Sequence, residues 1–339
     1  MPVLANPFAV PGNWYRGNLH CHTTNSDGAM PPDRLLAHYS YAGWDFLSIT
    51  DHGKVTTFPE GTALPGVTYI PGIEVSTPPG STRTGTNYHI VGIDVKETPP
   101  RPDLTGPAAA QWYLDAIREQ GGIAHLAHAY WSGLRLDDLQ PLKGYYALEV
   151  FNADTEVHIG RGLSQAVWDD LLSERIPTCA VAVDDCHRPG YDSLRAWTVV
   201  RAADQSAEAI VDALRAGHFY ASAGPEILDV QWEPQGMRSG VPYGGAVTVR
   251  CSPARSVSLV CDATKGSRVN AGPFGMALRG RRLRTETNRP EGVLGDELLT
   301  GAVFELRGIE RYARIQVEDA LGRCAWTNPL FVRSTEEEG

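Results

Sequence analysis

The feature that most constrains the fold is a series of short apolar runs that end on acidic or histidine residues. Asp45–Thr50 precedes Asp51 and His52, and Thr178–Val183 precedes Asp184. Similar runs lie at 67–74, 88–93, 123–128, 147–151 and 195–200. Their length indicates buried strands, and stretches at 30–43, 107–120, 163–175 and 206–216 predict helices between them. This alternation predicts an α/β fold with a mainly parallel sheet or barrel, in which polar residues gather at the strand ends.

The pattern changes near residue 226, where helical periodicity stops. Segments such as 227–232, 247–251, 256–261 and 312–317 show the alternation of half-buried strands and are separated by Gly, Pro and Asn turns. We therefore expect two domains, an α/β domain over residues 1–225 and an all-β sandwich over residues 226–339.

A His-x-His pair lies near the start of the chain. In a strand, alternate side chains point to the same face, so His20 and His22 would project together, with Cys21 on the other side. Asp27, on the loop that follows, adds an oxygen ligand. Alone, such a pair is as easily structural as metal-binding.

The positions of the other histidines favour a metal-binding role for this pair. Seven of the ten lie at or near predicted strand ends within the first 187 residues, and Asp185 and His187 repeat the alternate-residue spacing. Burying so many ionisable groups at one end of a sheet without a metal would carry a large desolvation and repulsion cost. The set predicts a multinuclear metal site. The remaining three, His38, His158 and His218, are expected to be structural or solvated.

Composition limits the partners and the compartment. The formal net charge of −10 argues against a nucleic-acid partner, and the one basic cluster, 279–284, is interpreted as an exposed hairpin. No apolar run is long enough to span a bilayer, and no signal peptide is expected. The six cysteines lack Cys-x-x-Cys spacing, which favours free thiols in a cytoplasmic protein. The oligomeric state is left open.

Several motifs resemble the PHP (polymerase and histidinol phosphatase) superfamily of metal-dependent phosphoesterases. They are His20-Cys-His22 with Asp27, Thr50-Asp-His52, Gly72-Ile-Glu74, Ala127-His128-Ala-Tyr-Trp131 and Asp185-Cys-His187. Leu148-Glu-Val-Phe-Asn152, 217–225 and 323–329 are similar to the carbaryl-hydrolase-like branch of that superfamily. The resemblance implies a distorted (β/α)7 barrel followed by the β-sandwich domain, and a metal-dependent hydrolase.

The resemblance also implies a trinuclear site with nine ligands. They are His20, His22, Asp27, His52, Glu74, His89, His128, Asp185 and His187. His20, His22 and Asp185 would hold the first metal. Glu74 would bridge it to a second metal, held also by His89 and His128. Asp27, His52 and His187 would hold the third, and Asp185 and His187 are the expected catalytic residues. His125, outside the family pattern, is an alternative to His128.

The predicted reaction is hydrolysis of a phosphate mono- or diester by a hydroxide that bridges two or three divalent ions. His and carboxylate ligands suit zinc, manganese or iron. Arg188 and Lys54 are candidates to hold a phosphoryl oxygen, while Tyr130 and Trp131 are candidates to contact an organic leaving group. We expect a small-molecule ester substrate, no nucleic-acid polymer and no membrane.

Two competing interpretations remain open from the sequence. The same metal site would serve a carbamate or carboxylester hydrolase, in which the nucleophile attacks a carbonyl carbon. A non-catalytic metal-binding or carbohydrate-binding module is less consistent with the ligand set, because open coordination positions are typical of catalytic sites.

Overall fold

The computed structural model describes residues 6–59, 66–238, 241–272, 280–283 and 298–333. The chain divides into two compact units. The barrel unit comprises Pro11–Leu171 and Thr178–Ala221. The sandwich unit comprises the described residues from Ser222 onward, together with those before Pro11 and with Leu172–Pro177. The division therefore falls a few residues before the expected boundary at 225/226.

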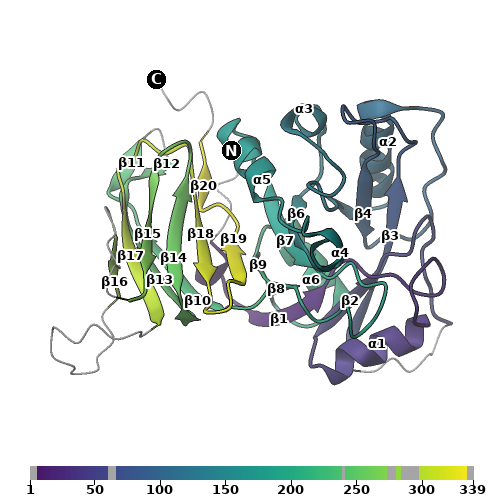
Figure 1. The fold of residues 1–339 in the computed structure, drawn as a ribbon, viewed down its shortest axis with the longest axis horizontal. Helices are drawn as coiled ribbons and strands as arrows, with labels where there is room; N and C mark the ends of the chain where they lie inside the picture. Colours follow the sequence, from purple (N-terminus) through teal and green to yellow (C-terminus); the bar gives the residue numbers. More distant parts are fainter. Residues whose placement is uncertain (1–5, 60–65, 239–240, 273–279, 284–297, 334–339) are drawn as a thin grey trace. The chain divides into compact units, whose positions relative to one another are not determined.

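Seven strands form the frame of the barrel unit (Figure 1). They are β1 (Asn13–Asn18), β2 (Phe46–Ile49), β3 (Thr68–Ser76), β4 (His89–Ile93), β5 (Ile123–Leu126), β6 (Ala147–Asn152) and β7 (Cys179–Val183). Each strand pairs with the next along the chain. A parallel bridge between Cys21 and Cys186 joins the extensions of β1 and β7 and closes the barrel. The amide of His22 donates to the carbonyl of Cys186 at 2.9 Å in this bridge.

One strand breaks the parallel arrangement. β4 runs antiparallel to both β3 and β5, whereas the β1–β2, β2–β3, β5–β6 and β6–β7 pairs are parallel. This reversal has a direct consequence for the site. His89, the first residue of β4, lies opposite Ser76 at the end of β3. A histidine that begins a strand therefore reaches the barrel end where the other strands terminate.

Helices cover the strands with their apolar faces. α1 (Pro32–Tyr41) begins with proline in its first turn and buries Leu35, Leu36 and Tyr39 against a cluster that includes Leu47 and Ile49. α2 (Gly106–Glu119) packs against β4 and β5. The remaining elements of this region are α3 (Leu136–Leu139), α4 (Ala153–Ile159), α5 (Gln165–Ser173), α6 (Ala207–Arg215), β8 (Trp197–Ala202) and β9 (Phe219–Ser222). The predicted alternation of strands and helices is confirmed.

The sandwich unit is antiparallel throughout its named strand pairs. One sheet has the order β10 (Ile227–Glu233), β13 (Gly245–Ala254), β17 (Leu299–Leu306), β16 (Gly280–Arg282). The other has the order β15 (Gly266–Asn270), β14 (Ser256–Cys261), β18 (Tyr312–Glu318), β19 (Cys324–Thr327), and β20 (Phe331–Val332) pairs with β18. β11 (Gly236–Arg238) and β12 (Val241–Tyr243) form a separate hairpin, and η1 (Pro7–Ala9) contacts β10.

The core of this unit forms between the two sheets. Val247, Val249 and Cys251 alternate with more exposed residues along β13 and are buried. The rings of Trp232 and Phe331, which come from opposite sheets, lie 5.1 Å apart. Two such sheets pack face to face because the alternate, inward-facing side chains of each sheet are buried against the other. The predicted all-β sandwich is confirmed.

Three smaller expectations concern the basic cluster, the cysteines and membrane-spanning segments. Of the basic cluster, Gly280–Arg282 forms β16, whereas residues 279 and 284 lie outside the described residues. All six cysteines are free thiols, as expected. Within the described part of the chain, no helix combines the length and apolar character that a membrane span requires.

Candidate metal centre

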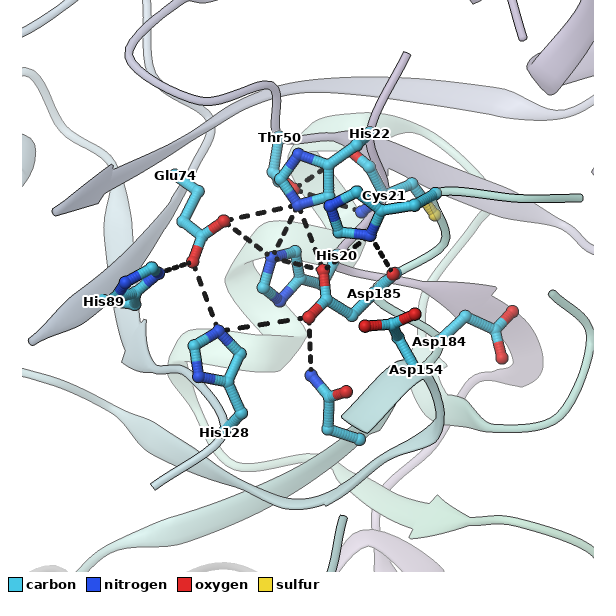
Figure 2. Close-up of polar contacts among 12 residues, drawn as sticks. His20, Cys21, His22, Thr50, Glu74, His89, His128, Asp154, Asp184 and Asp185 are labelled. Atoms are coloured by element: carbon cyan, nitrogen blue, oxygen red, sulfur yellow. Dashed lines mark hydrogen bonds and ion pairs between the residues drawn. The ribbon is translucent and has the colours of Figure 1, made fainter. Parts of the chain in front are cut away.

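The ends of the barrel strands bring the nine predicted ligands to one place. His20 and His22 lie on the extension of β1, Glu74 near the end of β3, and Asp185 just beyond β7. Figure 2 shows imidazole rings converging on the carboxylates of Glu74 and Asp185. A cavity of about 440 Å³ opens onto this cluster.

The innermost group contains two imidazoles and two carboxylates, all buried. Asp185 Oδ1 lies 3.1 Å from His20 Nε2 and 3.0 Å from His22 Nε2. Glu74 Oε2 lies 3.2 Å and 3.3 Å from the same two nitrogens. Ligand atoms about 2.1 Å from a common ion stand about 3.0–3.5 Å apart in tetrahedral or octahedral geometry. The spacing of these four atoms therefore fits one bound ion.

The second oxygen of Glu74 faces a different pair of histidines. Glu74 Oε1 lies 2.6 Å from His89 Nδ1 and 3.4 Å from His128 Nε2. His128 Nε2 is also 3.9 Å from Asp185 Oδ2. The two oxygens of one carboxylate are thus directed at two groups of nitrogen ligands, which is the arrangement of a bridging ligand.

A third group lies at the more exposed edge of the cluster. Asp27 Oδ2 is 3.5 Å from His52 Nε2, and Asp27 Oδ1 is 3.5 Å from His187 Nε2. The ring of His22 stacks on that of His187 with centroids 4.2 Å apart, so this group adjoins the innermost one. Asp27 is 55% exposed, in contrast to the buried Glu74 and Asp185. These contacts are looser than those of the inner group.

The chemistry of the donor set supports cation binding. His20 Nδ1 is 2.6 Å from Glu149, His128 Nδ1 is 2.9 Å from Ser132 Oγ, and His187 Nδ1 is 2.8 Å from the carbonyl of Asp185. A histidine that donates through Nδ1 presents the lone pair of Nε2 on its other side. These lone pairs face carboxylate oxygens. Asp185 Oδ1 is buried and, among the described residues, has no donor within hydrogen-bond distance other than the imidazole nitrogens of His20 and His22. A cation between them would relieve the repulsion.

Without a bound cation, protons on the histidines relieve this repulsion. Burial opposes the charged form of His22, but Asp185 and Glu74 outweigh it and raise its pKa to about 9. Burial likewise opposes ionisation of Glu74, yet His20 and His89 hold its pKa well below the usual range. The ionised carboxylates of the site thus favour positive charge on the groups beside them, whether protons on the histidines or bound metal ions supply it.

Two of the candidate ligands have unusual backbone conformations. Asp185 has φ +55° and His128 has φ +25°. Residues other than glycine rarely adopt positive φ, and each such residue costs roughly 1–3 kcal/mol. The barrel nevertheless holds both side chains toward Glu74 and the first histidine pair. Strain of this kind often accompanies functional positions.

Glu149 is a buried member of the site to which the sequence analysis gave no role. Its carboxylate accepts hydrogen bonds from the His128 amide at 2.7 Å and from Asn152 Nδ2 at 2.8 Å, besides its contact with His20. His125 Nε2 lies 3.3 Å from the same carboxylate. The alternative in which His125 replaces His128 is not favoured, since His128 faces Glu74 whereas His125 contacts Glu149. The sequence offered one indication of this role, because Glu149 is the single acid inside the apolar run 147–151.

The substrate-contact candidates divide into two sets. Arg188 and Trp131 line the cavity, together with Asp154, Thr155 and His158. Lys54 and Tyr130 are exposed and are absent from that lining. His158, expected to be merely structural or solvated, lies 3.4 Å from Arg188 Nη1 through its Nε2. Its position on the short helix α4 gave no local signal of a site.

Two strand-end acids stabilise loops instead of facing the cluster. Asp51 accepts from the Thr23 amide and from the hydroxyls of Ser26 and Thr56. Asp184 accepts from the amides of residues 194, 195 and 196. The Cys21 side chain points away from the carboxylates, as the strand pattern predicted (Figure 2).

No protein-family model matches this chain. Two curated proteins are similar to it in sequence. A 5'-3' exoribonuclease of Haemophilus influenzae is 30% identical over 196 residues, which is 51% of this chain and 65% of that protein. The 5'-3' exoribonuclease Rnm of Salmonella typhimurium is 29% identical over 137 residues, which is 35% of this chain and 42% of that protein. The match thus spans less than two thirds of either relative.

Solved structures with an overall likeness include a two-domain protein from Bacteroides vulgatus that contains a predicted PHP-like metal-dependent phosphoesterase. It is 16% identical, with a TM-score of 0.48, covering 92% of this chain and 93% of that chain. An amidohydrolase from Chromobacterium violaceum is 17% identical, with a TM-score of 0.39, covering 52% of this chain and 89% of that chain. None of these four names the carbaryl-hydrolase-like branch, which stays a prediction.

The names of the two relatives overturn one expectation. A small-molecule ester substrate with no nucleic-acid polymer was expected, yet both curated relatives are named for action on RNA. The physical error lay in using the charge of the whole chain. The formal net charge of −10 includes the carboxylates of the candidate metal centre, which bound cations would neutralise locally. Whole-chain charge therefore does not exclude an anionic polymer from this cavity.

Proposed function

We propose that this chain is a metal-dependent phosphoesterase that hydrolyses phosphodiester bonds in RNA. The observation that carries the proposal is the placement of Glu74. Its Oε2 faces His20, His22 and His52, while its Oε1 faces His89 and His128. A carboxylate shared in this way fits adjacent divalent ions, and a phosphoryl group has enough oxygens to meet more than one of them.

Nine residues would hold up to three ions in this proposal. His20, His22 and Asp185 would hold the first, His89 and His128 the second with Glu74 between them, and Asp27, His52 and His187 the third. Mixed imidazole and carboxylate ligands suit zinc, manganese or iron. When bound, such ions activate water at neutral pH and neutralise the charge that develops on a phosphoryl group.

The protein's own groups supply orientation and charge. Glu149, Ser132 and the Asp185 carbonyl each hold the Nδ1 of one histidine, so that Nε2 is directed inward. Arg188 lies in the cavity wall, where its guanidinium can donate to phosphate oxygens. RNA is favoured as the substrate because the two curated relatives are named exoribonucleases.

A substrate panel with metal analysis tests the proposal. The metal-loaded full chain would be given a 5'-phosphorylated RNA oligomer, bis-p-nitrophenyl phosphate, p-nitrophenyl phosphate, a naphthyl carbamate and a naphthyl acetate. We expect turnover of the RNA and the phosphodiester, with two to three divalent ions per chain by elemental analysis. Turnover confined to the carbamate or acetate would contradict the proposal and favour the alternative of a carbamate or carboxylester hydrolase.

A further inference from the structure

Large apolar side chains are exposed on the segments that border the metal cavity. Trp131 is 40% exposed, Tyr191 46% and Tyr130 48%. Ile159 and Leu163, near the end of α4, are exposed as well. Large exposed apolar side chains clustered beside a cavity often mark a binding surface, whereas isolated ones do not. We call Tyr130, Trp131 and Tyr191 the aromatic rim.

Trp131 connects the rim to the candidate metal centre. It lines the cavity, and its ring centroid lies 4.9 Å from that of His128 and 6.0 Å from that of His89. The indole is therefore positioned by the ligand histidines on one side and remains partly open to solvent on the other.

Tyr191 lies three residues after Arg188, which lines the cavity. Its amide donates to the carbonyl of Arg188 at 2.9 Å, and its hydroxyl lies 3.5 Å from the carbonyl of Val157 on α4. Arg188 and His158 of the cavity wall are thus on the segments that hold Tyr191. The backbone contacts fix the loop while the phenol ring stays exposed.

Tyr130 carries a cation on its ring. The Arg161 guanidinium carbon lies 5.5 Å from the centroid of Tyr130, within cation–π range. The Tyr130 amide donates to Ser164 Oγ at 3.1 Å, which ties this loop to the segment after α4. A guanidinium therefore lies over the aromatic ring that precedes the cavity-lining Trp131 in the sequence.

We propose that the aromatic rim stacks the unpaired bases of single-stranded RNA while the adjoining phosphate enters the metal cavity. This inference rests on the proposed function and adds the form of the substrate. Every base has a π-face, so aromatic side chains next to cations bind single strands with little sequence preference. In a duplex those faces are covered by neighbouring bases. Trp131 belongs both to the rim and to the cavity lining, and this link to the candidate metal centre favours RNA over a protein as the occupant.

Binding can be measured without hydrolysis. The full chain, with metal removed by a chelator, would be titrated into a fluorescein-labelled ten-nucleotide RNA, its duplex, and an abasic oligomer of equal length. We expect binding to the single strand at least tenfold tighter than to either of the others. Alanine at Tyr130, Trp131 or Tyr191 should weaken single-strand binding roughly 5- to 100-fold per residue.

Matched variants separate stacking from folding. Trp131→Phe, Tyr130→Phe and Tyr191→Phe keep an aromatic face and should retain most of the affinity. Tyr41→Ala removes a tyrosine that is 92% exposed on α1 and should leave binding unchanged. With metal restored, the ratio of kcat/KM for the RNA to kcat/KM for the abasic oligomer should fall in the alanine variants.

The two proposals fail in different ways. Equal binding of single strand, duplex and abasic oligomer, or rim alanine variants that bind RNA like the wild type, would overturn the stacking inference even if phosphodiesters are hydrolysed. Rim variants that change the oligomeric state without changing RNA binding would also overturn it, by showing a protein partner. Absence of phosphodiester turnover with normal stacking would instead contradict the proposed function.

Discussion

Glu149 Oε1 lies 2.6 Å from His20 Nδ1, and both side chains are fully buried. The contact fixes which nitrogen of His20 faces the candidate metal centre. The same carboxylate accepts from the amide of His128, a residue of the second group. One buried acid thus positions ligands of two groups without belonging to either of them.

Replacing Glu149 with glutamine tests this positioning role. The amide keeps the size but removes the charge, and its NH₂ cannot accept from His20 or His128. We expect metal affinity to fall about 10–100-fold, as is usual when the partner of a ligand histidine is altered. The free energy of unfolding should fall by about 1–3 kcal/mol, because buried donors lose part of their acceptor. Competition with a chromogenic chelator measures the first quantity and chemical denaturation the second.

The control for this variant is Glu208→Gln, which changes an acid in the first turn of α6. It should leave metal affinity unchanged. Metal affinity equal to that of the wild type in Glu149→Gln would show that the tautomer of His20 is fixed in some other way.

Glu74→Gln should have a larger effect. The change keeps the shape of the side chain but removes the charge that faces two groups of histidines. We expect at least one fewer bound ion per chain and a loss of orders of magnitude in phosphodiester hydrolysis. Elemental analysis and steady-state kinetics on the same preparation make the comparison. Full metal occupancy with a rate loss of only about 10–100-fold would instead assign Glu74 to an orienting role.

Metal binding should release protons at neutral pH. In the metal-free protein Asp185 and Glu74 overcome the effect of burial and raise the pKa of His22 to about 9. An ion that binds to His22 must displace that proton, so apparent metal affinity should rise with pH up to about 9. Calorimetric titration at pH 7 in buffers of different ionisation enthalpy counts the released protons. A release of zero would contradict the raised pKa.

The same shift predicts how metal-free stability depends on pH. The pKa of His22 is raised from its ordinary value of 6.5 to about 9 in the folded state. Its contribution to stability is therefore fully present below about pH 6.5 and is lost as the pH rises through about 9. The Tm of the chelator-treated protein should fall across this interval. The metal-loaded protein should lack this decrease, because its histidine ligands are already unprotonated.

The convergence of the candidate ligands was predictable because it depends on local pattern. Apolar runs that end on histidine or acid mark strand ends, and the strand ends of a barrel meet at one rim. His89 was predicted as a ligand from family resemblance, but the antiparallel course of β4 was not predicted. The direction of a strand depends on how the chain returns to the barrel, and the residues of β4 do not indicate whether it runs parallel or antiparallel to its neighbours.

Relationships between distant residues were harder to foresee. Glu149 lies in a strand like any buried residue, and its partner His20 is 129 positions away in the sequence. The need for acceptors arises only when the barrel closes and buries His20 Nδ1. The position of His158 in the cavity wall was unforeseen for a similar reason, since the short helix α4 is brought to the cavity by the strand that precedes it.

Arg188→Ala should reveal how the cavity recognises its substrate. Arg188 lines the cavity and approaches His158, and no described carboxylate forms an ion pair with its guanidinium. A cation in that position is free to donate to an anionic group of the substrate. Losing a charge-assisted hydrogen bond costs about 1.5–3 kcal/mol, so kcat/KM for a phosphodiester should fall about 10–150-fold. Arg188→Lys should recover part of this loss, because lysine keeps the positive charge. The recovery should be incomplete, because a point charge replaces the guanidinium's fork of donors. Arg34→Ala is the matched control, since that exposed arginine on α1 is absent from the cavity lining. Equal phosphodiester turnover in Arg188→Ala and Arg34→Ala would remove Arg188 from substrate binding.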